Sequence, residues 1–208
     1  MDEESDHALD IDLELPRALW TPQYETILAD WSDKAMSYRW MHRNCNSIYS
    51  WRNALFTIPV ITLSTITGTA NFAMEHFDEQ YRDYVPMAIG ALNICAGIVG
   101  TIHQYLKVAE TCEGHRVAYI AWDKFYRTVK LELAKPPTER SSVHDFVRIC
   151  KEEYDRLMET SPRIHDDVVR KFIETFKNEN FAFPEVCNKM RSTHDYIYSE
   201  APEDMVHV

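Results

Sequence analysis

The chain has 208 residues, with 33 acidic and 22 basic side chains and a formal net charge of −11. Because nucleic-acid-binding proteins are usually basic, this charge argues against a nucleic-acid partner. A hydrophobic fraction of 45% and an aromatic fraction of 12% exclude a globally disordered chain. The length fits one domain with tails, but the charges are distributed unevenly along it.

The acidic charge is concentrated at the beginning of the chain. Residues 1–33 contain ten acidic side chains and one basic side chain, and we interpret residues 1–20 as an acidic N-terminal tail. This region has no apolar stretch of the kind found in a cleaved signal peptide. Thr21 and Pro22 then predict the start of a helix, with Thr as the N-cap and Pro in the first turn. A helix that ran from Pro22 to Met74 would be roughly 80 Å long.

Two segments without charged residues follow, and each is long enough to cross a membrane. Residues 53–74 and 84–106 carry no charge, and about 20 helical residues span the hydrocarbon core of a bilayer. We therefore expect two transmembrane helices, at about 54–74 and 85–106, with the lipid bilayer as a partner. Because both segments contain several polar residues, the alternative is a buried helical hairpin in a soluble bundle.

The basic residues near the ends of the expected spans predict their orientation. Seven of them lie within about 20 residues outside the pair of spans: Lys34, Arg39, Arg43, Arg52, Lys107, Arg116 and Lys124. The connecting loop has one basic residue among four acidic ones. By the positive-inside rule both termini are expected to face the cytosol. Aromatic side chains are also expected near the interfaces: Trp51, Phe56, Phe77, Tyr81, Tyr84 and Tyr105.

Helical periodicity continues outside the spans. Apolar residues recur at intervals of three and four before the first span and again over 107–135, up to Pro136. These antiparallel helices are expected to pack along each other in the cytosol like a coiled coil, using the large faces of Trp20, Trp31, Trp40, Trp51 and Trp122. Further helices are expected at 141–160 and from Ser161-Pro162 to about 177.

The predicted fold class is therefore all-α: a two-transmembrane helical hairpin whose long helices extend into a cytosolic helical bundle. The expected organisation is an acidic tail at 1–20, the hairpin with its extensions at 21–135, C-terminal cytosolic helices at 138–178 and a polar tail at 179–208.

Polar and small residues form stripes on both spans. In the first, Thr62, Thr65 and Thr69 lie within about 60° of one another at 100° per residue. In the second, a stripe about 80° wide includes Asn93, Gly97, Gly100 and Gln104. Such stripes serve either as helix–helix contacts or as the wall of an aqueous path. Two helices enclose no cavity, so a path would require a homo-oligomer.

Few other residues suggest chemistry. His103, near the cytosolic end of the second span, is either a pH-sensitive group or an interfacial polar residue. Glu110, Glu113 and His115 resemble a carboxylate and histidine cluster, but we expect ordinary helix-surface positions. The five cysteines are widely spaced and expected to be free thiols. Without a nucleotide-binding, catalytic or metal-ligand motif, we expect no enzymatic activity, cofactor or metal.

Several ordered blocks resemble a known family. The runs WSDKAMSYRWMHR, IPVITLSTITGTANF, NICAGIVGTIHQYLKVAETCEGHRVAYIAWDKFYRTVKLEL and EEYDRLMETSPRIHDDVVRKF are similar to the SLATT group, two-transmembrane domains associated with SMODS and SLOG modules. The similarity covers roughly residues 31–177. It implies a pore-forming effector that oligomerises in a membrane. The chain carries no nucleotide-sensing domain, so it is more similar to the standalone members found in large DNA viruses.

These patterns lead to two functional hypotheses. The first is a membrane-embedded homo-oligomeric ion channel or pore, in which the two stripes line the path or set the close packing around it. Its partners would be the bilayer, other copies of the chain and ions. The second is a non-conducting membrane scaffold that recruits a partner through its cytosolic helices.

Overall fold

The computed structural model describes residues 20–76 and 78–187, and over these residues it contains helices and no strand. The all-α prediction is confirmed. The long helices are α1 (Pro22–Phe72), α2 (Tyr84–Tyr105), α3 (Val108–Leu133), α4 (Val143–Thr160) and α5 (Asp166–Phe176), and the short 3-10 helices are η1 (Met74–His76), η2 (Pro137–Glu139) and η3 (Glu185–Cys187). Phe77, residues 1–19 of the expected N-terminal tail and residues 188–208 of the expected C-terminal tail lie outside the described residues.

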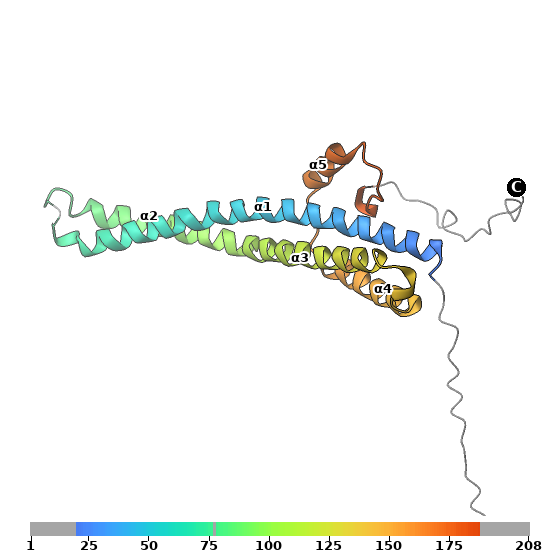
Figure 1. Ribbon diagram of the computed structural model, residues 1–208. Helices are drawn as coiled ribbons and strands as arrows, with labels where there is room; N and C mark the ends of the chain where they lie inside the picture. Colours follow the sequence, from blue (N-terminus) through green and yellow to red (C-terminus); the bar gives the residue numbers. More distant parts are fainter. Residues whose placement is uncertain (1–19, 77, 188–208) are drawn as a thin grey trace, which may run out of the picture.

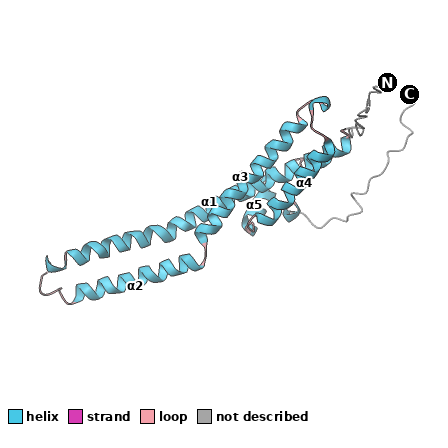
Figure 2. Cartoon of the chain, turned by 90° about the horizontal axis from the view of Figure 1, so that it is seen from below, coloured by secondary structure: helices cyan, strands magenta, loops and turns pink. Residues whose placement is uncertain are grey.

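Helix α1 runs the whole length of the described molecule (Figure 1). It begins at Pro22, directly after Thr21, as the capping pattern predicts, and its 51 residues correspond to about 77 Å. Helix α2 lies beside one half of α1 and α3 beside the other half, and α4 and α5 flank the α3 half (Figures 1 and 2). The molecule is thus a two-helix hairpin joined to a helical bundle.

A break at Lys107 separates α2 from α3. Its backbone has φ 50° and ψ 35°, the left-handed conformation, and no glycine or proline is present there. For a residue with a side chain, this conformation costs about 1 kcal/mol or more of backbone strain. Because the residue here is a lysine rather than a glycine, the sequence gives no sign of the break. It divides the uncharged helix α2 from the charged helix α3, where the chain passes from hairpin to bundle.

Aromatic side chains form the core of the bundle. The Trp122 ring is fully buried, stacks on Tyr38 with ring centroids 4.8 Å apart, and contacts Phe125 and Tyr154 edge-on. Of the other tryptophans, those at 20, 31 and 40 pack against this core. Trp51 does not, since 71% of its surface is exposed.

The C-terminal part of the bundle differs from the expected helix boundaries. Helix α5 begins at Asp166 rather than at Pro162. The Nδ1 atom of His165 accepts a hydrogen bond from the backbone N–H of Asp167 at 3.3 Å, and therefore caps the helix. Ser161 is not an N-cap: its hydroxyl accepts a hydrogen bond from Trp122 Nε1 at 3.0 Å. After α5, the described residues up to Cys187 return to the bundle, where Pro184 is buried.

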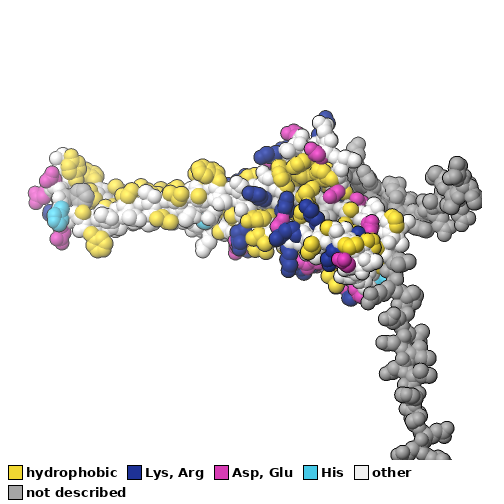
Figure 3. All heavy atoms as spheres, in the orientation of Figure 1, with side chains coloured by type: hydrophobic (Ala, Val, Ile, Leu, Met, Phe, Trp, Pro, Cys, Tyr) yellow, Lys and Arg dark blue, Asp and Glu magenta, His cyan; other side chains and the backbone are white. Residues whose placement is uncertain are grey.

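The uncharged segments are exposed rather than buried. In the most apolar 18-residue stretch of α1 only 6% is buried, and in the corresponding stretch of Tyr84–Leu133 only 11% is buried. Ile61, Phe72 and Met87 are 59%, 91% and 72% exposed. Charged side chains gather on the bundle and at the hairpin tip and are missing between them (Figure 3). Both helices are long and apolar enough to cross a membrane.

Candidate functional site

The two arms of the hairpin are joined by a polar contact that the sequence analysis missed. Thr67 is buried, and its hydroxyl lies 2.8 Å from Oδ1 of Asn93 while also bonding to the Leu63 carbonyl at 2.9 Å. Thr67 does not belong to the threonine stripe that the helical period predicted on the first span. Thr67 lies five positions before the end of α1 and Asn93 nine positions after the start of α2, so counting residues from the connecting loop does not pair them.

The threonine stripe lies on an exposed face of α1. Thr62, Thr65 and Thr69 are exposed, and each hydroxyl donates to the carbonyl four residues earlier, at 2.8 to 2.9 Å. Thr65 and Thr69 also border a shallow hollow of about 360 Å³, whose other lining residues are Ile66, Ala70 and Ala73. With its proton committed to the backbone, each exposed hydroxyl presents an oxygen that can only accept hydrogen bonds.

The glycine stripe of α2 has free space around it. A Cβ atom built on Gly97 or Gly100 would meet no other atom within 4 Å, so neither glycine is required for contact with α1. Gln104 is exposed near the end of the helix. Of the α2 stripe residues that we expected to line or pack a path, only Asn93 contacts α1 by a hydrogen bond within the described chain.

His103 is held at the base of the hairpin. Its Nε2 atom lies 2.8 Å from Oδ1 of Asn53, and its ring stacks on Phe56 with centroids 5.4 Å apart. These partners belong to the first uncharged segment, so His103 links the two arms at the end next to the bundle. In this position the histidine serves as an interhelical contact.

A second pair of histidines is buried where α1 and α3 pack together. The Nδ1 atoms of His42 and His115 are 2.9 Å apart, and the two side chains are 1% and 0% exposed. Tyr38 stacks on His42 and Tyr49 on His115. Burial lowers the pKa of His42 to about 3, with a further contribution from His115, and lowers the pKa of His115 to about 4. Both rings are therefore neutral at pH 7, one donating and the other accepting.

The apparent carboxylate and histidine cluster on α3 does not converge. Glu110 pairs with Lys107, and Glu113 pairs with Arg116 at 2.6 Å. His115 instead points into the bundle, toward His42. Among residues 20–76 and 78–187, no group of three metal-ligating side chains comes together, and the five cysteines are unpaired.

The geometry therefore places the candidate site on the exposed faces of the hairpin. No family model, no curated protein and no solved structure matches this chain.

Proposed function

We propose that the chain inserts into a membrane through residues 54–74 and 85–106, with both termini in the cytosol, and assembles into a homo-oligomeric ion channel. The observation that carries the proposal is an uncharged hairpin whose apolar and polar side chains are both exposed. Exposed apolar area of this extent is unstable in water and requires lipid or protein around it. Exposed polar stripes at membrane depth favour a second contact, with protein or with water.

The two stripes would have different roles in this assembly. The amide oxygen of Asn93 is already used by Thr67, and Gly97 and Gly100 leave room for a close neighbour. We assign the α2 stripe to packing between subunits, because small residues let helix backbones approach. The exposed stripe of Thr62, Thr65 and Thr69 would then line the path.

The threonine oxygens favour a cation as the conducted ion. Each hydroxyl donates its only proton to its own helix, as at Thr65 and the Ile61 carbonyl, so that lone pairs face the path. Rings of oxygen acceptors suit hard cations better than anions. The acidic loop that joins the arms would raise the cation concentration at the outer mouth. Pore formation is also what the resemblance to the SLATT group implies.

One observation favours the second candidate, a non-conducting scaffold. A threonine whose hydroxyl bonds to the carbonyl of the preceding turn needs no further partner and is tolerated facing lipid. The hairpin would then be an anchor, and the aromatic bundle would recruit a cytosolic partner.

Liposome flux and oligomeric state distinguish the two functions. Purified protein should release K⁺ across liposomes and migrate as one defined oligomer in native mass spectrometry. Gly97→Leu should disrupt both, because the side chain would fill the space between subunits. Ala91→Leu, which introduces the same side chain at an exposed position away from the stripe, is the control and should change neither. A wild-type oligomer without flux would favour the scaffold, and an unaltered Gly97→Leu oligomer would remove the packing role of the stripe.

A further inference from the structure

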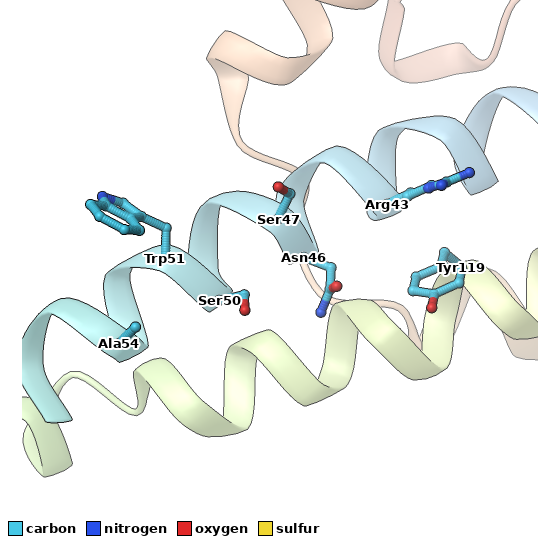
Figure 4. Close-up of a pocket in the computed structure, with 7 residues that line it drawn as sticks. All are labelled: Arg43, Asn46, Ser47, Ser50, Trp51, Ala54 and Tyr119. Atoms are coloured by element: carbon cyan, nitrogen blue, oxygen red, sulfur yellow. The ribbon is translucent and has the colours of Figure 1, made fainter. Parts of the chain in front are cut away.

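A pocket lies where the bundle meets the hairpin. It has a volume of about 470 Å³, opens to the outside, and is lined mainly by Arg43, Asn46, Ser47, Ser50, Trp51 and Tyr119. All of these belong to α1 except Tyr119, which faces them from α3 (Figure 4). It lies outside the stripes to which we assign conduction.

The α1 residues of the pocket form one face of the helix. They recur at intervals of three and four from Arg43 to Ala54, a distance of about 16 Å along the axis. The polar members come first and the apolar members last: Arg43 lies at one end, and Trp51 and Ala54 lie at the other (Figure 4). The apolar end coincides with the beginning of the first uncharged segment.

The polar end has unused hydrogen-bond donors and an unpaired positive charge. Several other basic side chains of the bundle have acidic partners, for example Arg39 with Asp123 at 2.6 Å. Within the described ranges Arg43 has neither an ion pair nor a hydrogen bond, and the hydroxyls of Ser47 and Ser50 are likewise unpartnered. No acidic residue lines the pocket. A guanidinium beside two hydroxyls is suited to a phosphate group.

The apolar end identifies the source of that phosphate. Trp51 is 71% exposed at the edge of the uncharged segment, the position that tryptophan favours at a membrane interface. A soluble phosphate would gain nothing from Trp51 or Ala54. A ligand with a phosphate near Arg43 and hydrocarbon running past Ala54 would use both ends.

We propose that this pocket binds the headgroup of an anionic phospholipid in the leaflet next to the bundle. The inference rests on the membrane insertion proposed above and does not depend on conduction. Basic pockets at the cytosolic ends of transmembrane helices are recognised sites for such headgroups. The lipid would contact α1 and, through Tyr119, α3, and would thereby tie the bundle to the membrane surface.

Arg52 provides a matched control for Arg43. It lies nine residues further along α1, which places it on the opposite face at 100° per residue, and it is exposed beside Tyr49, with its guanidinium 5.4 Å from the ring centroid. Both arginines are near the membrane edge, and neither has a salt bridge within residues 20–76 and 78–187. Replacing either one removes the same charge, but only Arg43 lines the pocket.

The test uses full-length protein in phosphatidylcholine nanodiscs, titrated with fluorescent phosphatidylserine while energy transfer from tryptophan is measured. We expect wild type and Arg52→Ala to bind phosphatidylserine with similar affinity, and Arg43→Ala to bind about fivefold more weakly. Ser47→Ala/Ser50→Ala should weaken binding with no change in net charge. Circular dichroism should show that all variants retain their helices, because the substituted side chains are exposed.

Three results would overturn the proposal. The first is equal loss in Arg43→Ala and Arg52→Ala, which would indicate a diffuse charge effect. The second is unchanged binding by Arg43→Ala. The third is equally potent displacement by soluble glycerol phosphate, which would show a phosphate site without lipid recognition. If the protein inserts into nanodiscs but shows one of these results, only this proposal fails. A chain that does not insert at all overturns the proposed function as well.

Discussion

Acidification should destabilise the bundle through the histidine pair between α1 and α3. His42 and His115 are buried with their Nδ1 atoms 2.9 Å apart. Burial lowers their pKa values to about 3 and about 4, whereas an unfolded histidine has a pKa of about 6.5. Because the folded state favours the neutral rings, their contribution to stability is complete above pH 6.5. It is lost as the pH falls toward 4 and then 3.

The size of the effect follows from these pKa values. Between pH 7 and pH 5 the unfolded chain gains about three quarters of a proton per histidine, while the folded chain gains almost none. Linkage then gives a loss of about 2 kcal/mol for each residue, and about 4 kcal/mol for the pair. Protonation of both rings is opposed further, because two Nδ1–H groups cannot face each other at hydrogen-bond distance.

Denaturant unfolding of the detergent-solubilised protein measures this loss. Near-ultraviolet circular dichroism reports the packing of Trp122, which is fully buried among aromatic rings in the same bundle. The free energy of unfolding should fall by about 4 kcal/mol from pH 7 to pH 5 in the wild type. The double variant His42→Asn/His115→Asn, which keeps polar side chains but cannot titrate here, should lose much less. A wild-type change below about 1 kcal/mol, or an equal change in the double variant, would refute the reasoning.

Three further predictions concern packing and backbone. Trp122→Ala should destabilise the bundle by about 4 kcal/mol in denaturant unfolding, since it empties a fully buried site. Trp51→Ala, the control, should change the free energy of unfolding by no more than about 0.5 kcal/mol. Equal losses in the two variants would contradict the assigned core. Thr67→Val should weaken the hairpin by about 0.6 kcal/mol in steric-trap unfolding in bicelles. Adding Asn93→Ala to this variant should lower the free energy of unfolding little further. Fully additive losses from the two substitutions would argue against the contact. Lys107→Gly should raise the free energy of unfolding by about 1 kcal/mol, because glycine adopts the left-handed backbone conformation without strain. Lys107→Val should lower the free energy of unfolding. An increase with valine would exclude strain at this position.

The sequence predicted the helical elements well where local patterns determine them. Two stretches without charge located the helices able to span a membrane, and Thr21-Pro22 located the start of α1. The predicted start of α5 was wrong. Pro162 fits a first helical turn, but the Ser161 hydroxyl accepts a hydrogen bond from Trp122, and His165 caps the helix instead. Choosing between equally good local caps depends on tertiary contacts that sequence does not record.

The contacts between helices could not be predicted in the same way. His42 and His115 are 73 positions apart, and their meeting depends on the axial register of α1 against α3, which the break at Lys107 helps to set. Tyr119 enters the pocket for the same reason. The contact between Thr67 and Asn93 likewise depends on the axial offset of α2 against α1, because the two residues lie five and nine positions from the ends of their helices at the loop. The positions of the stripes in an oligomer stay a prediction, since they depend on neighbouring copies.

Single-channel recording with a cysteine in the threonine stripe tests the central claim most directly. In a Cys95→Ala background, which removes the exposed thiol of α2, Thr65→Cys protein in planar bilayers should give unitary cation currents that a hydrophilic thiol reagent blocks. Ile102→Cys, at an exposed position on the face of α2 opposite the glycine stripe, should conduct and resist the reagent. Absence of unitary current at any voltage, pH or calcium concentration, or equal block of both variants, would contradict a path lined by Thr62, Thr65 and Thr69.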